Sequence, residues 1–235
     1  MVTTTIDANG TTHFFSVYRD ASAIGKAMAF LPAGVAMAEA VPMLVYFHGH
    51  NQTANLAAYL RSNPANRDLR PLLSGKRVAL VQPWGGHKSS FLQFQTSAGL
   101  TALIEGGLRV LIEYANPPRP CPVRVPNPPS IILAAHSGGG AALRAAANSS
   151  SAYMPLVGQV WGFDCMYSGE GRQWIDWCQA NAAKRLRVRA SSHQWSRKPK
   201  AEAEKILAAG LANADVDVVD LAHDAFPRTF IPAFL

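Results

Sequence analysis

Residues 131–140 constrain the fold more than any other part of this chain. Five consecutive apolar residues (131–135) lead through a histidine into Ser137, and three glycines then open an alanine-rich stretch. The pattern predicts a buried strand at 131–135, a tight turn at Ser137 and a helix from about 139 to 147. Because glycines let so sharp a turn close without a clash, we expect the serine hydroxyl to stand exposed at a sheet edge.

The rest of the chain alternates between short apolar strands and amphipathic helices, which predicts an α/β fold with a doubly wound, mostly parallel sheet and helices on both faces. The predicted strands are 13–19, 28–31, 43–47, 77–82, 131–135, 157–163, 186–190 and 216–221, and the predicted helices are 55–61, 96–114, 139–147, 172–184 and 200–209. Seven prolines at 116–129 indicate a stiff surface connection. A length of 235 residues with 49% apolar and 16% charged residues suits a single domain, 1–235.

Three polar residues come directly after predicted strands, at the edge where parallel sheets bind their ligands. Ser137 follows the strand at 131–135, Asp164 follows the strand at 157–163, and His223 follows the last strand. A serine hydroxyl becomes a strong nucleophile when a histidine accepts its proton and a carboxylate orients that histidine. The sequence therefore predicts a catalytic triad of Ser137, His223 and Asp164.

The order Ser, Asp, His and the turn Ala135-His136-Ser137-Gly138-Gly139 resemble the α/β-hydrolase superfamily over nearly the whole chain, from about residue 14 to 235. The turn departs from the usual Gly-x-Ser-x-Gly because alanine occupies its first position, and alanine is still small enough for the turn. The resemblance implies an oxyanion hole formed by the backbone N–H groups of Gly138 and His50.

The position of the acid is less common in this superfamily. The usual acid follows the strand that we expect at 186–190, where this chain has Ser191-Ser192-His193 and no carboxylate. Asp164, one strand earlier, is the preferred candidate, and Glu170 is the alternative. Asp220 and Asp224 are poor candidates because near neighbours along an extended segment point away from His223.

These residues favour a serine hydrolase that cleaves carboxylic esters through an acyl-enzyme. An amidase, peptidase or thioesterase with the same triad, and a non-catalytic binding protein on a hydrolase scaffold, remain as alternatives. Only about fifty residues separate Ser137 from the strand at 186–190, so we expect no large lid domain and a preference for short or accessible esters, or for the end of a polymer. Four large side chains near strand ends belong either to the acyl pocket or to the core: Trp84, Trp161, Met166 and Tyr167.

Charge and cysteine content limit other functions. The net charge of +7 includes the alternating Arg185, Arg187 and Arg189, which is typical of a strand with one solvated face, and no nucleic-acid-binding motif accompanies it. No apolar run reaches the roughly 20 residues needed to span a membrane. The cysteines and histidines show no metal-ligand spacing, and we expect no metal and no cofactor.

The three cysteines and the amino terminus bear on localisation. An odd number of cysteines without a C-x-x-C pair favours reduced thiols and the cytoplasm, although the spacing also allows a bridge between Cys165 and Cys178. The amino terminus has no signal-peptide pattern, and a mature secreted form would look the same. The sequence leaves the oligomeric state and the natural substrate open.

Overall fold

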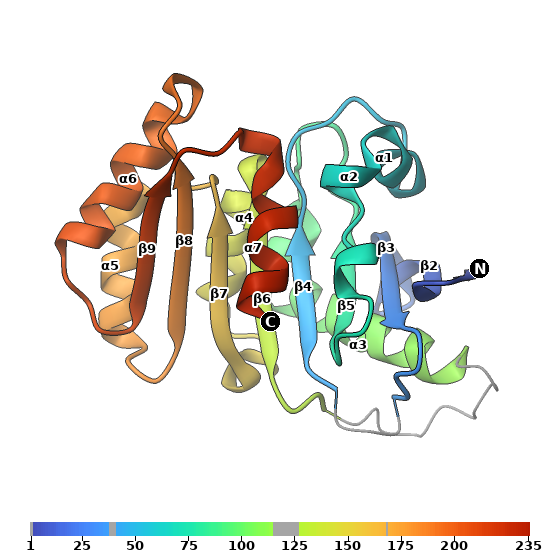
Figure 1. The fold of residues 1–235 in the computed structure, drawn as a ribbon. Coiled ribbons are helices and arrows are strands. Elements are labelled where there is room, and N and C mark those ends of the chain that lie inside the picture. Colours follow the sequence, from blue (N-terminus) through green and yellow to red (C-terminus); the bar gives the residue numbers. More distant parts are fainter. Residues whose placement is uncertain (1, 38–40, 115–126, 168) are drawn as a thin grey trace.

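The computed structural model describes residues 2–37, 41–114, 127–167 and 169–235. Within these ranges nine strands form one sheet in the order β1-β2-β3-β5-β4-β6-β7-β8-β9 (Figure 1). The strands are β1 Thr3–Asp7, β2 Gly10–Arg19, β3 Ser22–Pro32, β4 Met43–Phe47, β5 Ala79–Pro83, β6 Ile131–His136, β7 Val157–Phe163, β8 Arg185–Ser191 and β9 Ala214–Val219. Pairing is antiparallel from β1 to β5 along the sheet and parallel from β5 to β9, which confirms the predicted mostly parallel sheet.

Helices cover both faces of this sheet. The helices are α1 Leu56–Ser62, α2 Pro64–Arg67, α3 Ser97–Glu113, α4 Gly140–Ala147, α5 Glu170–Ala180, α6 Arg197–Ala208 and α7 Phe226–Phe234. Buried side chains of α3, α4, α5 and α6 share one apolar cluster with the sheet. Those of α1 and α7 share a second cluster on the opposite face, with α2 packed beside α7 (Figure 1). The doubly wound arrangement therefore agrees with the prediction.

The central strand β4 shows why a strand in the middle of this sheet has no polar face. Val45 and Phe47 belong to the cluster under α3 and α4, whereas Leu44 and Tyr46 belong to the cluster under α1 and α7. Successive side chains of a strand point to opposite faces, and both faces are covered here. A continuous apolar run is therefore what this position in the sheet requires.

Three of these strands and helices were not predicted from the sequence, namely β1, α7 and the four-residue α2. β1 is exposed along its whole length and consists mainly of threonines, so it lacks an apolar pattern. α7 contains Pro227 in its first turn and Pro232 in its interior, and both weaken a helix prediction. The predicted proline-rich connection at 116–129 lies outside the described residues except for 127–129.

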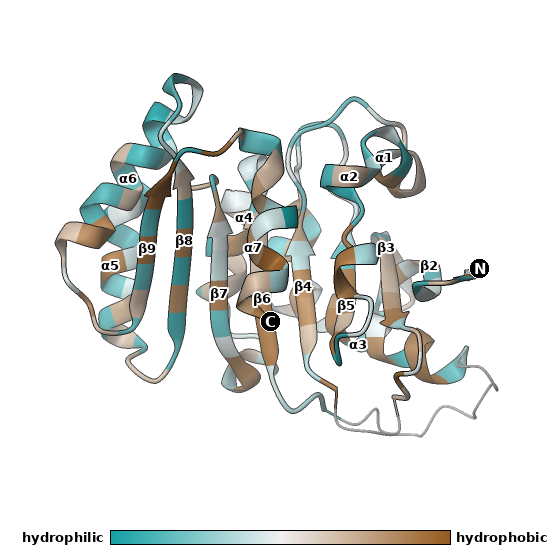
Figure 2. Ribbon diagram, in the orientation of Figure 1, coloured by the Kyte–Doolittle hydropathy of each residue, from teal (hydrophilic) through white to brown (hydrophobic). Residues whose placement is uncertain are grey.

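The arginines of β8 differ from the expected solvated face. Polar and apolar residues alternate along β8, as its banding in Figure 2 shows. However, the side chains of Arg187 and Arg189 are only 16% and 13% exposed. Their guanidinium carbons lie 4.6 Å and 4.9 Å from the ring centroid of Phe234 in α7. An Arg189 nitrogen also lies 2.8 Å from a carboxylate oxygen of Asp215 in β9. The carboxyl-terminal helix thus covers the polar face of β8 at Arg187 and Arg189, whereas Arg185 is exposed as predicted.

The chain between α4 and β8 contains only a short turn, β7 and α5 among its described residues, so it forms no large lid domain. Cys165 and Cys178 are both buried and free, without a disulfide between them. Over the same ranges, no helix combines the length and the apolar character needed to cross a bilayer.

Candidate active site

The three residues of the predicted triad all lie just beyond the carboxyl ends of parallel strands. Ser137 follows β6, Asp164 follows the neighbouring strand β7, and His223 begins the turn before α7. Ser137 and Asp164 have positive φ angles of 52° and 46°, which non-glycine residues rarely adopt. A strained backbone at two adjacent strand ends marks this edge as a candidate functional site.

Glycines after Ser137 are required by close backbone packing. A Cβ atom at Gly139 would lie 2.3 Å from the carbonyl oxygen of Phe47 in β4. A Cβ atom at Gly140 would lie 2.0 Å from the carbonyl oxygen of Cys165, after β7. Because neither carbonyl belongs to a flexible side chain, only glycine lets the start of α4 approach the sheet this closely. This packing fixes the turn that carries Ser137.

Asp164 is buried and oriented toward His223. Its Oδ2 atom lies 2.5 Å from Nδ1 of the His223 ring. The backbone N–H of Ser191 donates to Oδ1 at 3.1 Å, and the hydroxyl of Ser196 donates to Oδ2. The carboxylate is only 1% exposed, so these donors replace the water that a buried charge would otherwise lose. The carboxylate therefore holds the proton of His223 on Nδ1 and leaves Nε2 free to accept another.

Glu170 and Asp220 are engaged elsewhere, whereas a carboxylate oxygen of Asp224, expected to point away, lies within 4.8 Å of a ring nitrogen of His223, whose Nδ1 is taken by Asp164. Glu170 accepts a hydrogen bond from the backbone N–H of Tyr167 at 3.0 Å and lies 3.7 Å from Arg144. Burial raises the pKa of Glu170. Asp220 contacts the ring of His193 at 2.6 Å. The structure thus brings Asp164, and neither Glu170 nor Asp220, to His223.

The loop after β4 is fixed by His48. Its Nδ1 donates to the carbonyl of Gly49 at 2.7 Å, and its Nε2 accepts from the backbone N–H of Gly85 at 3.1 Å. Its ring stacks on Trp84, with centroids 4.9 Å apart. Burial lowers the pKa of His48 to about 4, so the ring is neutral and can use both nitrogens in this way. His48 thereby ties the loop to the neighbouring strand end.

The same loop lies directly against the serine turn. A Cβ atom at Gly49 would lie 2.8 Å from Cβ of Ser137, and one at Gly138 would lie 2.4 Å from Cδ2 of His50. The two residues expected to supply the oxyanion hole, Gly138 and His50, are therefore in contact. Glycine at positions 49 and 138 permits this approach.

His136 supports the loop that carries His223. Its Nε2 donates to the carbonyl oxygen of His223 at 2.9 Å, and the two rings have centroids 4.5 Å apart. Burial lowers the pKa of His136 to about 4, and the neighbouring His223 contributes to the same shift. The ring is neutral and holds His223 beside the serine turn.

A cavity of about 230 Å³ opens at this edge of the sheet. The residues that line it are Gly49, His50, Tyr59, Asn66, Arg67, His136, Ser137, His223 and Asp224. Among the described residues, no hydrogen bond joins the hydroxyl of Ser137 directly to the His223 ring. Such bonds are often unformed before substrate binds.

Sequence reasoning missed the residues of α2 in this wall. Asn66 and Arg67 belong to a four-residue helix with no buried residue, and such a segment carries no periodic signal. Tyr59, also in the wall, is a buried residue of α1 that the apolar pattern alone assigns to the core.

Four aromatic or sulfur-containing side chains are candidates for the acyl pocket from the sequence. Trp161 and Met166 are buried in the two apolar clusters at 0% and 1% exposure, and so belong to the core. Trp84 stacks on His48. Tyr167 is 36% exposed, and a hydrogen bond with the hydroxyl of Ser137 opposes the rise in its phenol pKa caused by burial. Of the four, only Tyr167 contacts Ser137 in the described part of the chain.

Side chains that could ligate a metal also meet in this cavity. Ligand-type atoms of His136, His223 and Asp224 lie within 4.8 Å of one another. Since Nδ1 of His223 is bonded to Asp164, a metal here would occupy Nε2. Metal binding and proton transfer at that nitrogen would exclude each other.

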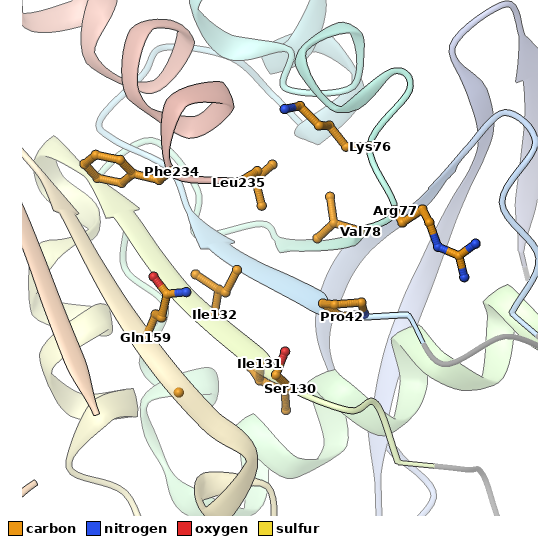
Figure 3. A pocket seen from close by; sticks show the side chains of 11 residues that line it. Pro42, Lys76, Arg77, Val78, Ser130, Ile131, Ile132, Gln159, Phe234 and Leu235 are labelled. Carbon is orange, nitrogen blue, oxygen red and sulfur yellow. The ribbon is translucent and has the colours of Figure 1, made fainter. Parts of the chain in front are cut away.

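A second cavity, of about 350 Å³, lies at the opposite ends of the strands (Figure 3). Its walls include Pro42, Lys76, Ile132 and Phe234, and it contains none of the predicted site residues. Figure 3 shows mainly apolar side chains facing this space, with the charged groups of Lys76 and Arg77 at its rim. The predicted nucleophile and base both line the first cavity.

Comparisons with known proteins support the architecture. No protein-family model matches the sequence, and no curated protein matches it. Solved structures do match. Fluorophosphonate-binding serine hydrolase F of Staphylococcus aureus has a TM-score of 0.62 at 9% identity, over 96% of each chain. A mutant of the feruloyl esterase module from Clostridium thermocellum, complexed with sinapinate, has a TM-score of 0.60 at 11% identity, over 99% of this chain and 84% of that one.

A third solved structure extends the likeness. Dienelactone hydrolase from Anabaena variabilis has a TM-score of 0.56 at 14% identity, over 96% of this chain and 95% of that one. At identities this low, the structural likeness establishes the fold alone, and the activity has to be argued from the site. The sheet order, the two helical layers and these neighbours together show that the chain has the α/β-hydrolase fold.

Proposed function

We propose that this protein is a serine hydrolase that cleaves carboxylic esters through an acyl-enzyme. The observation that carries the proposal is the hydrogen bond between Asp164 and His223 at a cavity that also contains Ser137. The left-handed backbone of Ser137, between a strand and a helix, fits the nucleophile elbow of this fold. The esterases and serine hydrolases among the solved structures of similar fold support the same reaction class.

The reaction proceeds in two halves. Oγ of Ser137 attacks the ester carbonyl carbon while Nε2 of His223 accepts the hydroxyl proton, and Asp164 stabilises the imidazolium that forms. The N–H groups of Gly138 and His50 stabilise the oxyanion. His223 then donates its proton to the alcohol oxygen as the carbon–oxygen bond breaks. A water molecule, deprotonated by His223, attacks the acyl-enzyme, and the acid leaves as the proton returns to Ser137.

Labelling with a fluorophosphonate tests the nucleophile directly. We expect one label per chain, mapped by peptide analysis to Ser137, and no label on Ser137→Ala. Ser74→Ala removes an exposed serine outside the cavity and serves as the matched control that keeps the label. Absence of label on the wild-type protein would favour a non-catalytic binding protein, and label on the Ser137→Ala variant would exclude Ser137 as the nucleophile.

The bond that is cleaved can be tested with matched acetyl substrates. An ester, a thioester and an anilide with the same acetyl group differ only in their leaving group. We expect the ester to give the highest kcat/KM. The anilide carbonyl is a poorer electrophile because its nitrogen is conjugated with it, and the order of ester above thioester is the specificity that we propose. A higher kcat/KM for the anilide or the thioester would assign the triad to the alternative activities.

A further inference from the structure

Helix α2 places two polar side chains in the wall of the cavity around Ser137. Asn66 and Arg67 line the same space as Ser137 and His223. Neither residue has a part in the proton transfers described above. A substrate bound beside Ser137 would nevertheless meet both side chains.

Arg67 is held in a fixed position. One of its guanidinium nitrogens donates to Oγ of Ser62 at 2.6 Å. The guanidinium carbon lies 5.1 Å from the ring centroid of Tyr59, in a cation–π arrangement. A long side chain loses less entropy on binding a ligand when it is already ordered. Arg67 is therefore prepared to bind before any substrate arrives.

The positive charge of Arg67 has no carboxylate partner among the described residues. By contrast, Arg70, three positions later, forms an ion pair with Asp68 at 2.7 Å. The charge of Arg67 contributes to the lowered pKa of His48, so its field reaches the loop beside Ser137. Asp224 is the acidic group in the same wall, but it is exposed to solvent, which screens its charge.

Asn66 provides a second and independent observation. Its Oδ1 atom is buried and has no hydrogen-bond donor within the described part of the chain. A buried acceptor without a donor is costly, so such atoms in a binding site indicate a place for a ligand hydroxyl or N–H. Asn66 and Arg67 line the same small cavity, so one ligand that carries a donor and an anionic group would meet both residues.

We propose that Arg67 and Asn66 form a subsite for a carboxylate and a neighbouring hydroxyl, so that the substrates are small esters of hydroxy acids or other carboxylate-bearing compounds. The inference rests on the proposed ester hydrolase activity. Arg67 pairs with the carboxylate, and Oδ1 of Asn66 accepts a hydrogen bond from the hydroxyl group. A guanidinium fork matches carboxylate geometry, which explains why an arginine stands at this position.

Two matched pairs of esters test the carboxylate. Mono-4-nitrophenyl succinate is compared with 4-nitrophenyl butyrate for the acyl side, and 4-acetoxybenzoate with phenyl acetate for the alcohol side. In at least one of the two pairs, we expect the anionic ester to have a kcat/KM about 10- to 100-fold higher than that of its neutral partner, which is the range for a charge-assisted hydrogen bond. In Arg67→Gln this ratio falls toward one. Arg61→Gln, which changes an exposed arginine of α1 outside the cavity, keeps the wild-type ratio.

Inhibition by small acids tests the hydroxyl. Malate and succinate differ by one hydroxyl group, and each is measured as an inhibitor of 4-nitrophenyl acetate hydrolysis. We expect malate to inhibit several-fold more strongly than succinate, Asn66→Leu to remove that difference, and Arg67→Gln to weaken both acids. Hydrolysis of neutral esters without any anionic preference or inhibition would overturn this subsite and leave the proposed activity standing. Absence of all hydrolysis, with no fluorophosphonate label, would overturn the proposed activity itself.

Discussion

Asp164 and His223 are joined by a hydrogen bond of 2.5 Å between Oδ2 and Nδ1, although they lie 59 positions apart in the chain. Two further donors, the N–H of Ser191 and the hydroxyl of Ser196, fix the carboxylate from the segment after β8. The end of β8, where the sequence resemblance places the usual acid, thus contributes the donors that orient Asp164, the proposed acid after the neighbouring strand β7. A carboxylate at the end of β7 can therefore be held as firmly as one at the end of β8, because the segment after β8 supplies its hydrogen-bond donors.

Replacing Asp164 with asparagine should reduce kcat by about 10⁴-fold, since an amide no longer keeps the His223 proton on Nδ1. It also presents an N–H to donors that expect an acceptor, which should lower the free energy of unfolding by about 1–3 kcal/mol. Steady-state kinetics and urea unfolding measure the two effects. Glu170→Gln is the matched variant, and a larger loss of kcat there than in Asp164→Asn would make Glu170 the acid.

Adding one methyl group at Gly138 should disturb the oxyanion hole. A Cβ atom there would lie 2.4 Å from Cδ2 of His50, so the His50 ring and its loop must shift. Loss of one oxyanion donor typically lowers kcat by about 10²- to 10³-fold, and we expect Gly138→Ala to approach that range with little change in KM. Gly158→Ala, where a Cβ atom meets nothing within 4 Å, is the control. Unchanged kcat in Gly138→Ala would show that this contact is not needed for catalysis.

Short acyl chains should be the best substrates. The cavity of about 230 Å³ is smaller than the roughly 300–1,000 Å³ typical of sites for drug-sized ligands, and the described chain has no lid domain to extend it. In a series of 4-nitrophenyl esters from acetate to dodecanoate, kcat/KM should be highest for acyl groups of about two to four carbons, which is the length that we estimate this volume can hold. A maximum at long chains would show that substrate binds outside the described cavity.

Some site residues could be predicted from the sequence and others could not, because only some of them lie next to a segment with a recognisable apolar pattern. Ser137 and Asp164 directly follow apolar strands, so the edge of the sheet where they meet follows from strand polarity alone. Arg67 sits in a short polar helix without periodicity, and only the tertiary fold brings it to the cavity. α7 was hidden for a different reason, because its prolines oppose a helix prediction while its aromatic side chains stabilise it by packing.

Helix α7 should depend strongly on Phe234. The ring lies 5.4 Å from that of Trp161 and also covers the guanidinium groups of Arg187 and Arg189. Phe234→Ala should lower the free energy of unfolding by about 2–3 kcal/mol, below the 3–5 kcal/mol of a fully buried phenylalanine because this ring is half-buried. Urea unfolding should show a lower midpoint with an unchanged slope. Leu235→Ala, at an exposed neighbour, should change little, and equal effects of the two substitutions would contradict the packing described.

Acid should destabilise the fold through its buried histidines. Burial lowers the pKa of His136 from 6.5 to about 4, so between these values the unfolded chain binds more protons than the folded one. Stability is therefore complete above about pH 6.5 and decreases as the pH falls toward 4, by up to about 1.4 kcal/mol per pH unit for this ring. Between pH 7 and pH 5 the loss from His136 should reach about 2 kcal/mol.

The variant His136→Gln isolates this contribution, because glutamine can still donate to the carbonyl of His223 but does not titrate. Urea unfolding at pH 7 and pH 5 should show a difference about 2 kcal/mol smaller than in the wild-type protein. His87→Gln removes an exposed histidine and should keep the wild-type difference. His48, with its pKa also lowered to about 4, continues to destabilise both proteins in acid, so His136→Gln should reduce the acid sensitivity without abolishing it. An unchanged pH dependence in His136→Gln would mean that the ring accepts a proton in the folded state as readily as in the unfolded chain, and that His136 is not held neutral beside His223.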